Sequence, residues 1–120
     1  MADVYDLIVI GGGSGGLACA QRAAESGARV LLAESGRLGG TCVNVGCVPK
    51  KVMWNAAQLA EQFVDAVDYG FDIERCGHDW ARLVARREAY IERLNGIYKK
   101  NLEADGVELV SGRAGFVNNY

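Results

Sequence analysis

Two short apolar runs near the start of the chain flank a segment of helical composition. Residues 7–10 (LIVI) are apolar and mostly β-branched, and they end in a cluster of glycines. Residues 17–24 carry alanine and leucine without a helix breaker, and residues 30–33 form a second apolar run that Glu34 closes. This order predicts a βαβ unit whose two strands lie parallel, because the helical connection crosses over the sheet.

Two longer helical patterns occupy the second half of the chain. They cover residues 51–67 and about 80–103, with a predicted loop over residues 68–79 between them. Apolar residues at helical spacing predict one apolar face on each helix. On the first helix that face comprises Val52, Met53, Ala56, Leu59, Ala60, Phe63 and Val67. On the second it comprises Leu83, Val84, Ile91, Leu94 and Tyr98.

Two further short strands are predicted near the end of the chain. Gly106 ends the second long helix, and the apolar runs at residues 107–110 and 114–117 are joined around Gly112. With the βαβ unit, these elements predict an α/β protein with a parallel sheet and flanking helices. The chain has 120 residues, of which 50% are hydrophobic, and it is therefore long enough for one modest domain.

Charge and hydropathy exclude several classes of partner. The formal net charge is -2 and the two signs are interspersed, so the chain has no basic stripe for nucleic acid and no polybasic cluster for a membrane. No apolar run approaches the roughly 20 residues that span a bilayer. Asp3 and Asp6 stand where a signal peptide would carry positive charge. We therefore predict a cytoplasmic protein that binds neither nucleic acid nor membrane.

The glycines after the first strand match a phosphate-binding turn. Gly11, Gly13 and Gly16 form GxGxxG between a predicted strand and a predicted helix. In this motif the first glycine permits the turn, the second lets a pyrophosphate approach the backbone, and the third lets the helix pack on the strand. Free N–H groups and partial positive charge at the helix N-terminus favour the phosphates. Glu34 can then accept hydrogen bonds from the ribose hydroxyls of a dinucleotide.

The motif alone leaves the identity of the dinucleotide open. It does not separate FAD from NAD, whereas a carboxylate at Glu34 argues against the 2′-phosphate of NADP at this turn. A glycine-rich turn without any ligand is the alternative. The neighbouring strand, the helix and Glu34 together favour a dinucleotide over that alternative.

Cys42 and Cys47 are the candidates for a redox couple. On an ideal helix a five-residue step separates Cα atoms by roughly 8–9 Å, whereas a disulfide needs about 4.4–6.8 Å. A bridge therefore requires a departure from regular helix. Gly46 tolerates unusual dihedral angles, and Pro49 removes a helical hydrogen bond and disfavours helical geometry at Val48. Because such a bridge closes a short loop, it adds little stability, which favours a working disulfide over a structural one.

Other interpretations of the cysteines stay open at this point. A zinc site needs four ligands, but Cys19 and Cys76 are far away in the sequence and His78 is the only histidine, so no metal site is predicted. Two unpaired, buried thiols are the remaining alternative. We expect Cys19 to pack on the apolar side of the first helix and Cys76 to be an incidental loop thiol. Lys50 and Lys51 follow the pair and could stabilise a thiolate or a negatively charged flavin.

Longer stretches of the sequence resemble a known enzyme family. Residues 11–16 (GGGSGG), Glu34 and residues 38–55 (LGGTCVNVGCVPKKVMWN) are similar to the pyridine nucleotide-disulfide oxidoreductases. The likeness covers essentially the whole chain and continues through residues 68–71 (DYGF), Trp80 and residues 94–102 (LNGIYKKNL). The cysteine motif is the most specific of these segments.

The residues after the cysteines help to choose a branch of this family. Lys50, Lys51, Val52, Met53 and Trp54 resemble the glutathione reductases. Dihydrolipoamide dehydrogenases and mercuric reductases usually carry serine at the position of Lys50. Trypanothione reductases share the two lysines but usually lack Trp54. These three groups are the alternatives to a glutathione reductase.

The resemblance implies a reaction sequence. NADPH would reduce FAD, the flavin would reduce a Cys42–Cys47 disulfide, and the dithiol would reduce glutathione disulfide. Cys47 would form the charge-transfer contact with the flavin, and Cys42 would attack the substrate. Lys50 would lie near the reactive ring nitrogen of the flavin. The resemblance therefore implies catalytic roles for Cys42, Cys47 and Lys50.

The resemblance also implies binding residues. Those expected to contact FAD are Gly11, Gly13, Ser14, Gly15, Gly16, Glu34, Thr41, Cys42, Lys50 and the backbone at Ala114. Ser14 and Tyr98 are expected to touch glutathione, although Tyr98 could equally be a half-buried aromatic residue of a helix. In the family, an arginine that binds glutathione often occupies the position of Gln21. Because Arg22 is only a neighbour of that position, we do not assign glutathione binding to Arg22.

The resemblance further predicts what the chain represents. Residues 1–120 would be the N-terminal part of the FAD-binding, Rossmann-like domain, including the redox-active cysteine helix, with the NADP and dimerisation domains absent. Intact family members are homodimers in which the partner supplies a histidine and glutamate acid/base pair, and His78 is not that histidine. The alternative is an isolated flavin-binding module, or an inert thiol module, without catalysis.

Overall fold

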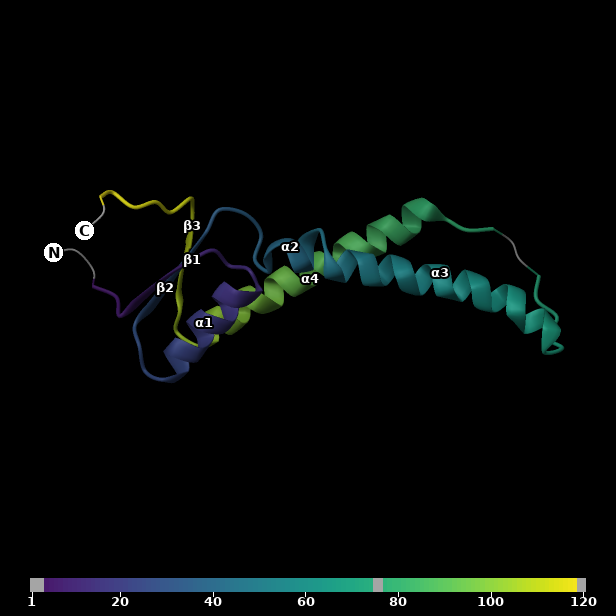
Figure 1. The fold of residues 1–120 in the computed structure, drawn as a ribbon, viewed down its shortest axis with the longest axis horizontal. Coiled ribbons are helices and arrows are strands. Elements are labelled where there is room, and N and C mark those ends of the chain that lie inside the picture. The colour runs from purple at the N-terminus through teal and green to yellow at the C-terminus, as the bar shows by residue number, and fades with distance from the viewer. Residues whose placement is uncertain (1–3, 75–76, 119–120) are drawn as a thin grey trace.

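A computed structural model describes residues 4–74 and 77–118, which form a small sheet at one end and two long helices that extend from it (Figure 1). The molecule measures 72 × 27 × 21 Å along its principal axes. Its elements are β1 (Leu7–Ile10), α1 (Ser14–Glu25), β2 (Val30–Glu34), α2 (Gly40–Asn44), α3 (Cys47–Asp68), α4 (Trp80–Ala104) and β3 (Glu108–Ser111). The predicted α/β class is confirmed.

The sheet has the strand order β1-β2-β3, and both pairings are parallel. Leu7 pairs with Val30 in the first pairing, and Leu31 pairs with Glu108 in the second. The predicted βαβ unit is therefore confirmed. The long connection through α3 and α4 returns the chain to the open edge of β2, where β3 completes the sheet.

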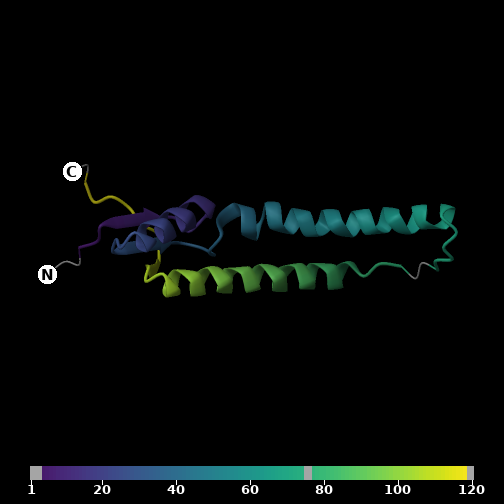
Figure 2. The ribbon, with the colours of Figure 1, turned by 90° about the horizontal axis from the view of Figure 1, so that it is seen from below.

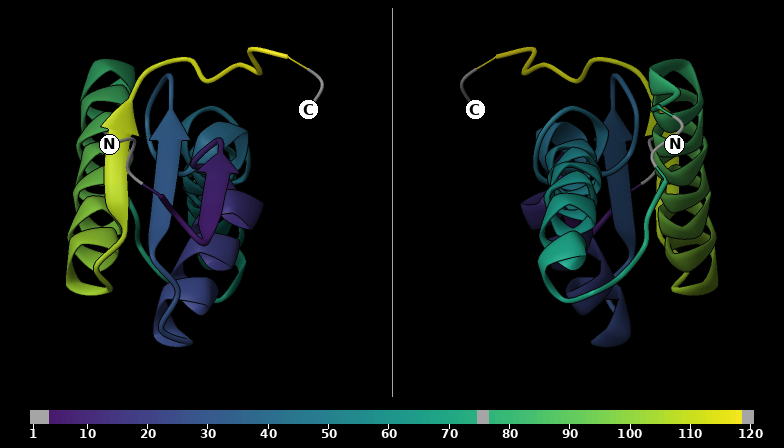
Figure 3. Two further views of the ribbon diagram at one scale, coloured as in Figure 1. Left: turned by 90° about the vertical axis from the view of Figure 1, so that its left-hand side faces the viewer. Right: turned by 90° about the vertical axis from the view of Figure 1, so that its right-hand side faces the viewer.

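One face of the sheet carries the hydrophobic core. Seen end-on, β2 lies between β1 and β3, and α4 runs beside β3 (Figure 3). Residues from β1, α1, β2, the end of α4 and the turn before β3 form a single cluster with the segment before α2. Its buried members are Val9, Leu17, Ala20, Val30, Leu32, Leu38, Leu102 and Val107. Side chains alternate along a strand, so Ile8 and Ile10 point to the other face of the sheet, where they are exposed.

α3 and α4 run antiparallel and side by side (Figure 2). The predicted apolar face of α4 is confirmed, since Ile91 is fully buried and the other four residues of that face are partly buried. We call residues 59–74 and 77–86 the outer arm. There the predicted face of α3 is only partly covered, with Leu59, Phe63 and Val67 about half exposed. The connection before α4 lines one hollow with this face through Ile73, Glu74, Gly77 and His78.

The chain after the sheet differs from the prediction. β3 ends at Ser111, and the strand predicted at residues 114–117 does not form, because these residues run away from the sheet and pair with no described strand (Figure 3). Phe116 and Val117 are almost fully exposed. Cys76 lies outside the described residues. Within the described ranges, none of the helices combines the length and apolar character needed to cross a membrane.

Candidate functional site

The glycine turn connects β1 to α1 in a conformation that glycine alone adopts easily. Gly11 has a φ of 98° and donates its N–H to the Ala33 carbonyl of β2 at 2.8 Å. Gly16 lies so close to the turn that an added Cβ would stand 1.8 Å from the Gly11 carbonyl oxygen. Gly13 precedes α1, and no side chain caps this helix. The first N–H groups of α1 therefore open onto the turn, and the exposed Ser14 and Gly15 are the first residues of the helix.

Glu34 lies at the end of β2 and joins two backbone segments. Its Oε2 atom accepts a hydrogen bond from the Gly12 N–H at 2.6 Å, and its Oε1 atom accepts one from the Gly36 N–H at 2.7 Å. Each carboxylate oxygen has a second lone pair, so Glu34 can also accept hydroxyl donors. The structure thus brings the carboxylate expected for a ribose directly beside the glycine turn.

The cysteine segment packs backbone to backbone on that turn. The Gly39 N–H donates to the Gly12 carbonyl at 2.8 Å. Gly39 and Gly40 both have positive φ, and a Cβ on Gly40 would lie 2.9 Å from the Gly13 Cα atom. A side chain on Gly40 would therefore separate the two segments, whereas one on Gly39 would collide with Val43 of the same segment. We call the glycine turn together with residues 37–47 the junction.

The two cysteines stand on either side of a break between helices. α2 ends at Asn44, Gly46 adopts φ -123° and ψ -112°, and α3 begins at Cys47. The predicted departure from regular helix is confirmed. Its proposed cause is wrong for Val48, which lies within the first turn of α3. Pro49 is accommodated there, because the first N–H groups of a helix have no intrahelical acceptor.

The structure describes Cys42 and Cys47 as neighbouring free thiols. A hydrogen bond from the Cys47 side chain and the partial burial of Cys42 raise the pKa of the Cys42 thiol, while the Cys47 backbone hydrogen bond and the nearby Lys50 charge act in the opposite direction. Cys42 therefore holds its proton more firmly than an ordinary thiol does. The alternative of two buried thiols is wrong, since Cys47 is exposed.

Cys19 does not pack on the apolar side of α1. Leu17 and Ala20 are the buried residues of that helix, and Cys19 projects from another side and is exposed. The described residues contain no cluster of three histidine, cysteine or acidic side chains that could hold a metal ion.

The other predicted site residues are scattered around the junction. Thr41 is exposed on α2, and Lys50 is exposed one turn into α3. A hollow of about 730 Å³ opens beside the cysteine segment, and its lining includes Lys50, Gly46, Pro49, Trp54, Arg37 and Arg87. Tyr98 is partly buried against the core cluster. Ala114 lies in the unpaired segment after β3, away from the glycine turn in sequence and without a described contact to it.

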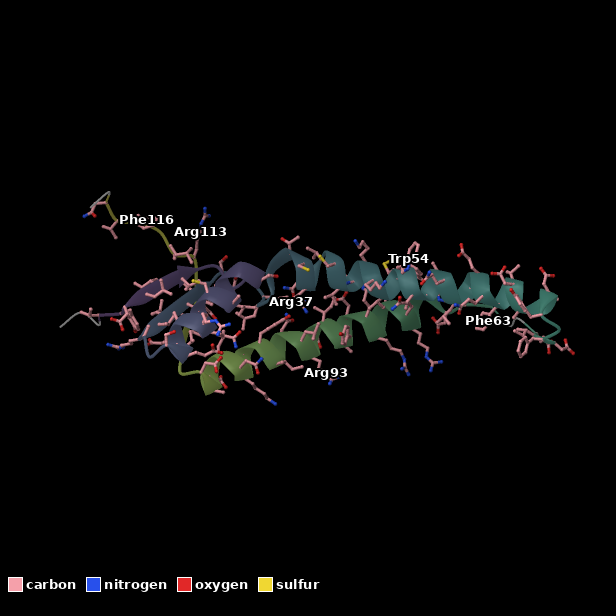
Figure 4. All side chains as sticks on the ribbon, turned by 60° about the horizontal axis from the view of Figure 1, so that its bottom comes forward. Arg37, Trp54, Phe63, Arg93, Arg113 and Phe116 are labelled. Atoms are coloured by element: carbon pink, nitrogen blue, oxygen red, sulfur yellow. The ribbon has the colours of Figure 1, made fainter. Side chains whose placement is uncertain are left out.

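A polar network at the junction has no counterpart in the sequence predictions. The side-chain amide of Asn95 on α4 donates to the Leu38 carbonyl at 2.7 Å and to Asn44 Oδ1 at 3.0 Å. Arg37 donates through Nε and Nη2 to Asn95 Oδ1, and Figure 4 places Arg37 beside α4. A signal was available, because Asn95 is a polar residue next to Leu94 on the apolar side of its helix.

The comparisons with known proteins agree over nearly the whole chain. The family described as "Pyridine nucleotide-disulphide oxidoreductase" matches residues 5–119. Glutathione reductase of Schizosaccharomyces pombe is 56% identical over 120 residues, which cover 98% of this chain and 26% of that protein. The corresponding enzyme of Yarrowia lipolytica is 58% identical over 114 residues (92% and 24%). That of Debaryomyces hansenii is 52% identical over 122 residues (96% and 25%). The chain thus spans about a quarter of the length of these relatives.

Proposed function

We propose, given that the chain belongs to the pyridine nucleotide-disulphide oxidoreductase family, that it is the N-terminal part of a flavoprotein that reduces glutathione disulfide with NADPH. The observation that carries this proposal is the adjacency of Cys42 and Cys47 at a junction built directly on a dinucleotide-type glycine turn. The identity to three glutathione reductases supports the choice of substrate.

The residues of the junction fit an FAD molecule. The turn is free of side chains at Gly11 and Gly13, the start of α1 has no side-chain cap, and Glu34 keeps lone pairs for ribose hydroxyls. When bound, FAD supplies two-electron transfer between a nicotinamide and a disulfide. Within this proposal Ser14, Gly15, Gly16, Thr41 and the Ala114 backbone line the cofactor, and Lys50 lies near its ring system. NADPH would bind outside these 120 residues.

The two thiols would have unequal roles. As a thiolate, Cys42 attacks one sulfur of glutathione disulfide, which breaks the S–S bond and releases the first glutathione. Cys47 then attacks the Cys42 sulfur, which releases the second glutathione and leaves the pair oxidised. Because the pKa of Cys42 is raised, a base must remove its proton before the first attack. Ser14 and Tyr98 would hold the substrate beside Cys42.

Turnover by the intact parent protein tests this function. We expect NADPH oxidation with glutathione disulfide to exceed that with lipoamide, trypanothione or mercuric ion. Cys42→Ser and Cys47→Ser should each abolish it, whereas Cys19→Ser, on the exposed side of α1, should retain it. An intact, flavin-loaded protein without turnover on glutathione disulfide would defeat the proposal, and preference for another disulfide would assign the chain to a different branch.

The exposed apolar residues of the outer arm support the expected assembly. Leu59, Phe63 and Val67 are about half exposed, which suits coverage by the remainder of the polypeptide or by a second copy in a homodimer. Residues 1–120 would form part of the FAD-binding domain, and the protein would work in the cytoplasm. Sedimentation of the intact protein tests the dimer, and a monomer with full turnover would contradict it.

The alternative function is an isolated flavin-binding module. If the 120-residue chain were purified with a yellow colour and developed a long-wavelength band on two-electron reduction, this alternative would gain support. A colourless product would count against it.

A further inference from the structure

The segment that carries Cys42 has little means of holding its own shape. α2 contains five residues, a length at which an isolated helix is not stable in water. It lies between two glycine positions, with Gly39 and Gly40 before Cys42 and the Gly46 break after it. Contacts other than the backbone hydrogen bonds of α2 must therefore fix the position of the Cys42 sulfur relative to Cys47.

Asn44 supplies the first of these contacts from the last residue of α2. Its side-chain amide donates to the carbonyls of Gly40 at 2.9 Å, Leu38 at 3.2 Å and Arg37 at 3.3 Å. The two N–H groups of the Asn44 amide are shared among these three acceptors, all of which lie within the seven residues before Asn44. This closes residues 37–44 into a compact loop around one amide.

Asn95 connects this loop to α4. Its amide donates at 2.7 Å to the Leu38 carbonyl and at 3.0 Å to Asn44 Oδ1. Arg37 donates two hydrogen bonds, at 3.1 and 3.0 Å, to Asn95 Oδ1 and so fixes the orientation of the amide. The Leu38 side chain is also buried in the core cluster, and this packing fixes the start of the loop against the sheet end of the molecule. Asn95 is therefore held by both the loop and its Arg37 side chain.

We propose that Asn95 is a positioning residue for Cys42. Its amide locks the loop that carries Cys42 onto α4, the helix whose other end packs against the sheet, and thereby keeps the Cys42 sulfur within reach of Cys47. This inference deepens the proposed function and rests on it. Asn95 touches neither thiol among the described contacts, so it acts through Asn44 and the Leu38 carbonyl.

The bridging equilibrium of the cysteine pair measures this positioning. The intact protein is equilibrated without oxygen in mixtures of reduced and oxidised dithiothreitol, quenched in acid, alkylated and mapped by mass for the Cys42–Cys47 peptide. Forming the Cys42–Cys47 bridge breaks the S–S bond of oxidised dithiothreitol, and two electrons and two protons pass from the cysteine pair to dithiothreitol. In Asn95→Ala, the loop gains freedom and the thiols meet less often. We expect the constant for forming the bridge to fall at least tenfold, which corresponds to about 30 mV.

Two further variants make the result specific. Asn101→Ala makes the same truncation on the same helix at an exposed side chain, and its bridging constant should stay within twofold of the wild type. Arg37→Gln removes the two donors to Asn95 from a side chain that is 46% exposed, and it should lower the constant two- to fivefold. Arg37→Gln also covers the case in which Asn95→Ala does not fold.

The melting temperature separates positioning from general stabilisation. A role in stability alone would lower the melting temperature of Asn95→Ala and leave its bridging constant within twofold of the wild type, which would overturn the proposal. An unchanged constant in Arg37→Gln, or an equal shift in Asn101→Ala, would overturn it as well. Exchange with dithiothreitol needs neither NADPH nor glutathione. Loss of the proposed function in turnover assays is therefore distinguishable from failure of this inference.

Discussion

The junction and the outer arm begin their helices in different ways. At the junction, α1, α2 and α3 follow Gly13, Gly39 and Gly46, and none of them has a side-chain capping hydrogen bond. In the outer arm, α4 follows Asp79, whose carboxylate accepts a hydrogen bond from the Arg82 N–H at 2.9 Å. A capped start satisfies its own backbone, whereas an uncapped start leaves N–H groups for a ligand or a solvent molecule. The stabilising side-chain cap is thus found in the outer arm, where no catalytic or binding residue is predicted, and not at the junction.

The same two regions differ in how they bury apolar residues. Leu32 and Leu102, which border the junction through the core, are 0% and 1% exposed. In the outer arm Leu59 and Val64 are 53% and 57% exposed, and Figure 4 shows Phe63 projecting from that end of α3. The junction end is packed by this chain itself. The outer arm presents surface that the described residues leave uncovered.

A pair of leucine truncations gives the largest expected difference between the regions. Leu32→Ala leaves a cavity in the closed core and should lower the free energy of unfolding by about 2–5 kcal/mol. Leu59→Ala removes a half-exposed side chain and should cost less than about 1 kcal/mol in the 120-residue chain. Urea unfolding of both variants checks the contrast. Equal losses would show that the outer arm is packed as tightly as the core.

A methyl group tests the close approach within the glycine turn. Gly16→Ala places a Cβ within 1.8 Å of the Gly11 carbonyl oxygen and should destabilise the chain by about 1–3 kcal/mol or more. Gly15→Ala is the matched control, because no atom lies within 4 Å of its Cβ. It should be neutral or slightly stabilising. A Gly16→Ala protein with unchanged unfolding would mean that the turn and α1 are not held in contact.

Removal of the cap tests the outer arm by itself. Asp79→Ala leaves the Arg82 N–H without its acceptor and should lower the free energy of unfolding by about 1 kcal/mol. The control is Asp72→Ala, an exposed aspartate in the connection before α4. Hydrogen exchange at the first turn of α4 should rise in the first variant only. Equal exchange in both would show that the cap does not hold the helix start.

The smallest expected effect is a pH dependence at the junction. The Cys47 hydrogen bond and partial burial raise the pKa of Cys42 in the folded, reduced chain above its unfolded value. The associated stability is fully present below the ordinary thiol pKa and is lost as the pH rises through the folded pKa. Alkaline pH should therefore destabilise the reduced wild type slightly more than reduced Cys42→Ser. Parallel unfolding curves across that range would contradict the shift.

The sequence predicts the parts of the fold that depend on local patterns. The runs at residues 7–10 and 30–33 pair as expected, and the spacing from Leu83 to Tyr98 correctly marks the packed side of α4. The break at Gly46, before Cys47, agrees with the departure from regular helix that a Cys42–Cys47 bridge requires. These predictions succeed because each rests on periodicity or on the covalent reach of a few residues.

Long-range contacts account for what the sequence does not predict. Asn95 and the Leu38 carbonyl are 57 residues apart, and only the return of α4 past the loop brings them together. The run at residues 114–117 has strand composition but meets no strand, and Cys19 shares a helix with Leu17 yet faces away from its packed side. In each case the contacts of the residue depend on which other segment packs beside it in the folded chain. A pattern along the chain does not contain that information.

The hydrogen bond from Gly39 to the Gly12 carbonyl has a consequence for protein engineering. A designer who transplants residues 38–50 into another scaffold would move the thiols without the backbone on which they rest. Gly40 cannot carry a side chain at this contact, because its Cβ would lie 2.9 Å from the Gly13 Cα atom. The smallest portable unit is therefore the cysteine loop together with the strand–turn–helix beneath it, and a graft that omits the latter should yield a peptide-like dithiol.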